Sequence, residues 1–153
     1  MTSETDRDFG RARKTVEKAV ARLGLDPAEC AIDADAGGAA WHLIRGSADV
    51  MVALNPGAGG VPGRLRLVAP VVRVDFDAKP ALLMRMLELN ATELPGVAFG
   101  VLGNKVVLVA ERSVVGLDLP EVEELLRLIG HFADKYDDEL VREFGGARVC
   151  DTD

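Results

Sequence analysis

The chain has 153 residues, a length typical of one domain that buries about 70% of its unfolded surface. Hydrophobic residues make up 48% of the chain and charged residues 28%, as in ordinary globular proteins. The formal net charge is −7, and the excess lies in residues 117–153, which hold eleven acids and four bases. This balance argues against nucleic acid as a partner, because a phosphate-binding surface needs clustered bases.

Membrane and secretory segments are not evident in the sequence. No apolar run approaches the roughly 18 residues that span a bilayer, and residues 1–8 lack the apolar core of a signal peptide. Cys30 and Cys150 are too few for a disulfide framework and lack metal-ligand spacing. We therefore expect a soluble, cytoplasmic protein with no membrane contact, metal or cofactor.

The first element is a predicted helix over residues 5–23, where apolar residues recur at helical spacing between interleaved charges. Gly24 is its predicted C-cap, and the Asp26-Pro27 pair ends the element. Residues 30–36 fit either an edge strand or an irregular connector.

Three antiparallel strands are predicted next, within residues 39–75. Alternating apolar residues and turn residues such as Gly46-Ser47 define them. Pro70 lacks a backbone N–H, so it predicts a bulge or an edge position in the third strand. The predicted strands are residues 39–45, 49–54 and 64–75.

The loop over residues 55–63 is rich in Gly and Pro. It lacks the Gly-Lys-Ser/Thr ending of a phosphate-binding P-loop, and the chain has no dinucleotide fingerprint. We therefore expect a long, mobile hairpin loop.

The second helix, predicted over residues 81–89, is apolar on nearly every side. Lys79-Pro80 opens it with Asp77 as a possible N-cap, and only Arg85 and Glu88 are charged. An ordinary surface helix has one apolar face. The second apolar face predicts either a second subunit that covers it or complete wrapping by the rest of the chain.

A second hairpin is predicted from residues 97–102 and 105–112, joined by a Gly103-Asn104 turn. Residues 106–110 are all apolar, without alternation, so both faces of this strand are expected to be buried. Burial of the second face is another indication of an interface.

The last helix is predicted over residues 119–144. Asp118 and Glu121 have capping-box spacing at its start, and Gly145-Gly146 ends it. We expect a single domain over residues 1–146 and a tail over residues 147–153.

An acidic cluster on this helix comprises Asp134, Asp137, Asp138 and Glu139. In a helix Asp134 and Asp138 share a face, while Asp137 is expected to turn away. The cluster lacks the loop geometry that hard cations favour, so we predict a solvated acidic face rather than a metal site.

A catalytic centre is not indicated. Cys30 and His42 can be drawn as a nucleophile and base, but no third group orients them. His131, the other histidine, lies on the last helix. We expect no catalytic residue, and keep a small-ligand site at Cys30 and His42 only as a minor alternative.

The order helix, three strands, helix, two strands, helix resembles the type III secretion chaperone-like fold, and most of all its YbjN-domain proteins. The similarity covers residues 80–145 well and the first half by element order only. It is carried by residues 82–90 (LLMRMLELN), 96–101 (GVAFGV), 111, 116–117 and 132–140 (FADKYDDEL).

The resemblance implies an α+β fold with helices on a twisted antiparallel sheet, frequent homodimers and no enzymatic activity. It implies a module that holds or regulates a partner polypeptide; a structural or regulatory YbjN-like role without client binding is the alternative. Met84 and Met86 suit an adaptable surface, although core or dimer positions remain open for them. The predicted interface residues are Leu83, Met84, Met86, Leu87, Val107 and Val109.

Overall fold

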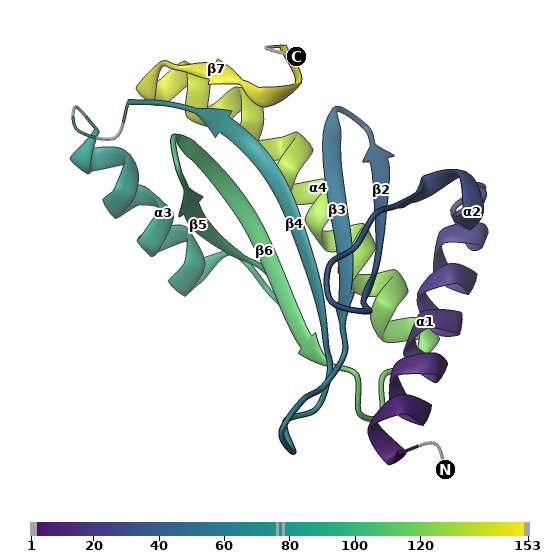
Figure 1. The fold of residues 1–153 in the computed structure, drawn as a ribbon. Helices are drawn as coiled ribbons and strands as arrows, with labels where there is room; N and C mark the ends of the chain where they lie inside the picture. The colour runs from purple at the N-terminus through teal and green to yellow at the C-terminus, as the bar shows by residue number, and fades with distance from the viewer. Residues whose placement is uncertain (1–2, 76, 78, 152–153) are drawn as a thin grey trace. The chain divides into compact units, whose positions relative to one another are not determined.

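The structure is a computed structural model that describes residues 3–75, 77 and 79–151. Figure 1 shows an α+β chain in the predicted order of helices and strands. Its helices are α1 (Glu4–Arg22), α2 (Pro27–Cys30), α3 (Pro80–Thr92), α4 (Leu119–Phe144) and the 3-10 turn η2 (Val149–Asp151). Its strands are β1 (Ala31–Ile32), β2 (Ala39–Arg45), β3 (Ala48–Asn55), β4 (Arg64–Arg73), β5 (Ala98–Leu102), β6 (Lys105–Ser113) and β7 (Ala147–Arg148).

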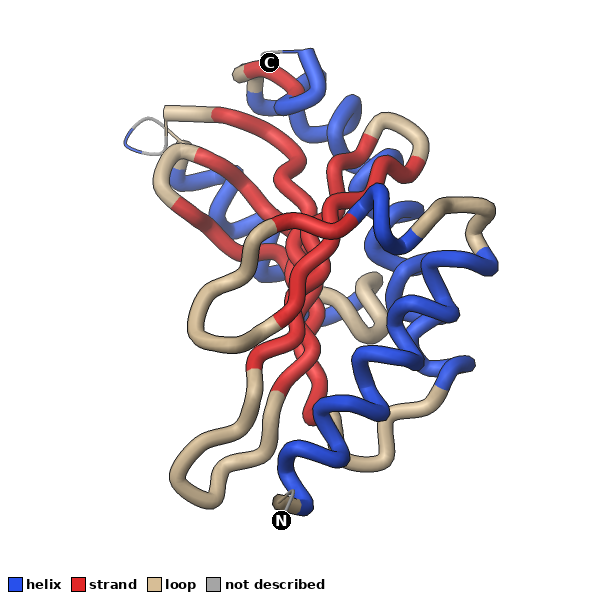
Figure 2. Tube along the Cα trace, turned by 45° about the vertical axis from the view of Figure 1, so that its right-hand side comes forward, coloured by secondary structure: helices blue, strands red, loops and turns tan. Residues whose placement is uncertain are grey.

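The strands, red in Figure 2, pair in the order β1-β2-β3-β4-β6-β5, and β7 pairs with β4 outside this path. The predicted meander and the second hairpin are confirmed, with Leu102 opposite Lys105 across the Gly103-Asn104 turn. The edge alternative for Pro70 is wrong, because β4 lies between β3 and β6. Of the two readings of residues 30–36, β1 supports the edge strand.

Two compact units make up the chain, and both draw on three separate segments. No single point in the sequence separates them. The first contains Met1–Leu43, Met51–Leu67 and Glu111–Leu126, and the second contains Ile44–Val50, Val68–Ala110 and Arg127–Asp153.

In the first unit, α1 starts at a capping box. The Asp6 N–H donates to Ser3 Oγ and the Ser3 N–H donates to Asp6 Oδ2, both at 3.1 Å. Such a cap contributes about 1 kcal/mol. One face of α1 is buried, and so are Trp41 and Leu43 of β2, as the alternation predicted. The C-cap is Leu23, one residue before the predicted Gly24, which follows it at φ +82°.

The loop over residues 55–63 is a compact turn, with Ala58 and Val61 exchanging two backbone hydrogen bonds. A Cβ on Gly57 would lie 2.4 Å from the Val61 carbonyl oxygen, and one on Gly63 would lie 2.6 Å from that of Asn55. Glycine is therefore needed at both positions for close backbone approach.

In the second unit, α3 begins at Pro80, and its N-cap is Lys79, which makes no side-chain cap hydrogen bond; the predicted N-cap at Asp77 is therefore wrong. The Asp77 N–H instead donates to Asp75 Oδ1 at 3.2 Å. Strand β6 is buried on both faces, as its unbroken apolar run predicted; its buried residues are Val106, Val107, Leu108 and Ala110.

Helix α4 has the predicted boundaries and the predicted cap. The Glu121 N–H donates to Asp118 Oδ1 at 3.0 Å, and the Asp118 N–H donates to Glu121 Oε2 at 3.2 Å. Arg112 reaches the same carboxylate, with Nε 2.9 Å from Oε1. No helix of the described residues is long and apolar enough to cross a membrane.

The structure corrects the prediction of a C-terminal tail over residues 147–153. Residues 147–148 form β7, which pairs antiparallel with the end of β4, and Val149 is buried. Only residues 152–153 of the predicted tail lie outside the described chain. The short run after Gly145-Gly146 gave no periodicity from which a strand of two residues could be predicted.

Candidate functional site

Helix α3 has two apolar faces, and only one of them is buried. Leu82, Met86 and Leu89 recur at helical spacing and lie in the interior. The opposite face carries Leu83, Met84 and Leu87, whose exposed fractions are 37%, 59% and 64%. We call these three residues the outer face of α3. It is the apolar surface for which the sequence predicted a cover.

The side-chain amide of Asn90 fixes the end of α3 to β5. It makes two hydrogen bonds to the backbone of one strand residue, as a neighbouring strand would. Asn90 Oδ1 accepts from the Phe99 N–H at 2.7 Å, and Asn90 Nδ2 donates to the Phe99 carbonyl oxygen at 3.2 Å. The outer face is therefore presented by a helix whose position is set by specific bonds.

Tyr136 of α4 makes a second set of contacts to the region where α3 meets β5. Its hydroxyl donates to Glu93 Oε2 at 3.1 Å, just beyond α3, and its ring meets Phe99 edge-on at 5.3 Å between centroids. Burial, together with the hydrogen bond to Glu93, raises the pKa of the Tyr136 hydroxyl. The proton therefore stays on the phenol, where the bond to Glu93 needs it.

The other predicted interface residues differ in accessibility. Met86 and Val107 are buried within the second unit, with exposed fractions of 4% and 1%, and Val109 is half-buried. A partner has no direct access to Met86 or Val107 in this structure. The part that any of the six predicted residues plays in an interface stays a prediction.

Sequence reasoning missed two exposed apolar residues, Val101 and Leu102, at the end of β5. Strand β5 is the last strand of the sheet and packs beside α3. Their exposure depends on that edge position, which an apolar run such as residues 97–102 does not reveal.

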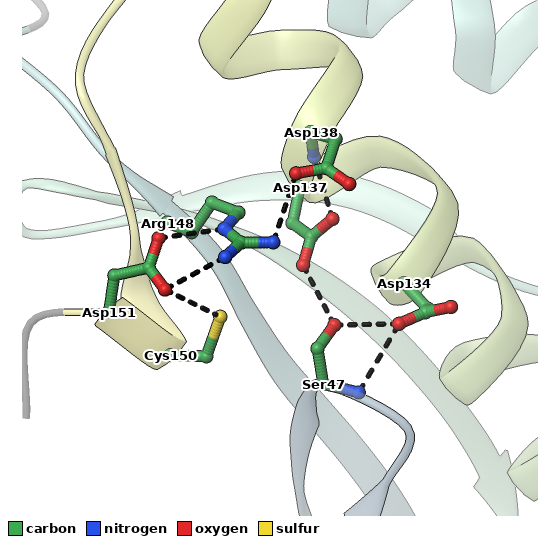
Figure 3. Close-up of polar contacts among 7 residues, drawn as sticks. All are labelled: Ser47, Asp134, Asp137, Asp138, Arg148, Cys150 and Asp151. Carbon is green, nitrogen blue, oxygen red and sulfur yellow. Dashed lines mark hydrogen bonds and ion pairs between the residues drawn. The ribbon is translucent and has the colours of Figure 1, made fainter.

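The acidic cluster is organised around Ser47, in the turn between β2 and β3 (Figure 3). Ser47 Oγ lies 2.6 Å from Asp134 Oδ1 and 2.8 Å from Asp137 Oδ2, and the Ser47 N–H donates to Asp134 Oδ1 at 3.2 Å. The hydroxyl has one proton, so it can donate to only one of the two carboxylates at a time. Its bonds lower the pKa of Asp134.

The predicted orientation of Asp137 is wrong. Its exposed fraction is 4%, and it faces Ser47 together with Asp134 rather than turning to solvent. The reason is the spacing of three residues, which places both carboxylates over the same turn. Among the described residues, no three or more His, Cys, Asp or Glu side chains form a group that could hold a metal.

The structure adds little support for the minor alternative, a small-ligand site at Cys30 and His42. Cys30 ends α2 as a half-buried free thiol, and His42 is exposed on β2. The β1–β2 register pairs Ala31 with Trp41, so Cys30 and His42 lie at the neighbouring positions. His131 packs edge-on against Phe132.

A family match decides what kind of protein this is. The model described as "T3SS (YopN, CesT) and YbjN peptide-binding chaperone 1" matches residues 11–152. The chain belongs to this family. The match confirms the resemblance stated from the sequence, and it describes a chaperone family rather than a class of enzymes. Among curated proteins, none matches the chain.

Solved structures confirm the fold of this family member. A chain of the ExsC–ExsE complex has a TM-score of 0.58 at 20% identity, covering 85% of this chain and 93% of that one. A chain of the HopA1–SchA chaperone–effector complex has 0.56 at 12% identity, covering 82% and 92%. A chain of the ExoU–SpcU complex from the type III secretion system of Pseudomonas aeruginosa has 0.54 at 14%, covering 80% and 94%.

Proposed function

We propose that this protein is a non-enzymatic chaperone that holds an apolar segment of a partner polypeptide against the outer face of α3. The observation that carries the proposal is the exposure of Met84 and Leu87 on a helix that is fixed by Asn90. Burying each such side chain under a partner stabilises the complex by about 1.5–3 kcal/mol at most. The family description and the chaperone–effector complexes among similar folds support the same function.

The outer face suits recognition by apolar contact rather than by hydrogen bonds. Met84 is unbranched and adapts to partners of different shape. The exposed Val101 and Leu102 at the neighbouring sheet edge offer further apolar contact, and exposed strand edges are a known way to bind extended segments. A client with spaced apolar residues fits this surface.

We also propose a homodimer, in which the outer face of α3 or part of it meets the same face of a second copy. A two-fold contact uses one patch twice, and a single apolar helix face meets that requirement. This part of the proposal rests on the same exposed residues. It keeps open the division of the surface between dimer and client. The cytoplasmic location expected from the sequence stays a prediction.

The test uses tagged wild-type protein, Leu87→Asp and the control Glu88→Gln, which changes an exposed polar residue of the same helix. Each is used to capture partners from lysate of the native host, and its mass is measured by light scattering after size exclusion. We expect the wild type and the control to capture the same dominant polypeptide, and Leu87→Asp to lose it while remaining folded.

Different results contradict the homodimer and the binding of a client. An unchanged mass of Leu87→Asp contradicts a dimer through this face. Equal capture by all three proteins contradicts client binding at the outer face. A single folded partner in fixed ratio favours a structural or regulatory domain without client binding.

A further inference from the structure

The end of β4 is covered by the protein's own C-terminal segment. In β7, Arg148 is paired with Val72 and Ala147 with Arg73, in an antiparallel ladder of two residues. A strand paired over only two residues belongs to the part of a protein that opens most readily. The backbone groups it covers are those that a longer extended segment would use.

Residues 146–149 are held against the end of β4 by a close backbone approach and a buried side chain. We call the place that they occupy beside Val72 and Arg73 the seat. Gly146 has φ +86°, and a Cβ there would lie 2.5 Å from the Arg73 carbonyl oxygen. Val149, on the other side of β7, is buried. The extended part of this segment is residues 147–148, preceded by the glycine turn at Gly146 and followed by Val149 at the start of η2.

Arg148 is the charged contact of this seat (Figure 3). Its guanidinium lies 3.0 Å from Asp138 Oδ1 on α4, and it forms two bonds of 2.7 and 2.9 Å to Asp151. Asp134 and Asp137 lie on the same helix, and residues 117–153 carry the acidic excess of the whole chain. Removal of Arg148 from this place leaves the Asp138 carboxylate of α4 open to a cation of another chain.

A hollow of about 690 Å³ adjoins the seat, and Gly146 and Ala147 line it together with Arg73, Val74, Gly103 and Asn104. The Arg73 Nε atom nearby is buried, and none of the described residues supplies it with a hydrogen-bond acceptor. Displacement of residues 146–149 would join this hollow to the strand edge, which gives room for side chains larger than glycine and alanine.

We propose that the edge of β4 at Val72 and Arg73 is a docking site for an extended, basic segment of a partner polypeptide, and that residues 146–149 occupy it until the partner displaces them. The nature of the partner rests on the proposed function; the self-occupied edge does not. Because the segment competes from within the same chain, only a partner held elsewhere as well displaces it efficiently.

The experiment uses the full-length chain as wild type, Arg148→Ala, Arg148→Lys and the control Arg142→Ala, which removes an equal charge from an exposed site on α4. Hydrogen exchange is followed by mass spectrometry in a fragment of residues 70–75. The probe is a labelled peptide with the sequence of residues 145–151 and Ser in place of Cys150, and a second peptide has Glu in place of its arginine.

We expect exchange in the fragment to rise about tenfold in Arg148→Ala, because charge-assisted hydrogen bonds are lost. Arg148→Lys should show a smaller rise, and Arg142→Ala none. The arginine peptide should bind Arg148→Ala about tenfold more tightly than wild type, and the glutamate peptide should bind neither.

Unchanged exchange in Arg148→Ala overturns the proposal, because the seat then does not depend on Arg148. Faster exchange without peptide binding, or equal binding to wild type and Arg148→Ala, also overturns it. These results leave the proposed function standing if Leu87→Asp still loses its client, so the two failures are distinguishable.

Discussion

Helices α3 and α4 differ in how many of their polar groups and apolar side chains find partners within the chain. Helix α4 starts at a reciprocal cap between Asp118 and Glu121, and its acidic side binds Ser47 and Arg148. Helix α3 starts without a side-chain cap, and its outer face, Leu83, Met84 and Leu87, lies at the surface.

The difference shows where a partner is needed. Exposed acidic residues need no cover, because water solvates them, yet several in α4 have acquired specific bonds within the chain. A contiguous apolar face has the opposite requirement and is unusual on a protein that acts alone. The contact with other polypeptides that we propose for the folded chain therefore lies on α3, whereas the acidic residues of α4 already bond within the chain through Ser47 and Arg148.

The largest expected effect separates the two faces of α3. Leu82→Asp places a charge at a fully buried position, and we expect a loss of about 3–5 kcal/mol or complete unfolding. Leu87→Asp, its matched exposed variant, should change the free energy of unfolding by less than about 0.5 kcal/mol in the monomer. Urea unfolding followed by circular dichroism measures both. Equal destabilisation would contradict the assignment of an outer face.

The next effect tests the acidic side of α4. Ser47→Ala removes the hydroxyl from the buried Asp137 carboxylate, and we expect a loss of about 1–3 kcal/mol because a buried acceptor loses its partner. Ser113→Ala, which removes one hydrogen bond to the Val115 N–H, serves as the control. Chemical unfolding that gives the same value for both variants would show Asp137 to be solvated after all.

A smaller effect is expected at the cap of α4. Asp118→Ala leaves the Glu121 N–H without its acceptor and should cost about 1 kcal/mol. No comparable loss is expected for Lys79→Ala at the start of α3, where no side-chain cap bond exists. Thermal unfolding of the two variants compares the helix starts directly, and a larger loss for Lys79→Ala would reverse the contrast.

The smallest effect is a dependence on pH. The pKa of Asp134 is lowered by the Ser47 hydroxyl and then by its N–H. The resulting stabilisation is present above the unfolded pKa, about 3.9, and is lost as the pH falls through the folded pKa. Stability of the wild type should therefore fall more steeply below about pH 4 than that of Ser47→Ala. Parallel curves would mean that Ser47 does not set this pKa.

Much of the fold was predictable because local patterns and local structure agree. Helix α4 and its cap follow from a periodic stripe and the Asp118–Glu121 spacing, and the β5–β6 hairpin follows from Gly103-Asn104. The second apolar face of α3 was also visible from its composition. These features depend on neighbours within a few positions in the sequence.

The features that the sequence did not reveal depend on distant partners. Asp137 is buried beside Ser47, which lies 90 positions away in the sequence and bonds to it. Met86 lies inside and Met84 outside, although both are methionines on one apolar helix, because the interior side depends on the packing of the unit. Strand β7 exists only because β4 offers it an edge.

The most direct test of the outer face of α3 is site-specific photo-cross-linking in the native host. A benzophenone amino acid replaces Met84 in one protein and the exposed Lys14 of α1 in a control. We predict a cross-link at position 84 to a second copy or to a client polypeptide, and none at position 14. Absence of a cross-link at position 84, or equal cross-linking at both positions, would contradict the assignment of the outer face as the contact surface.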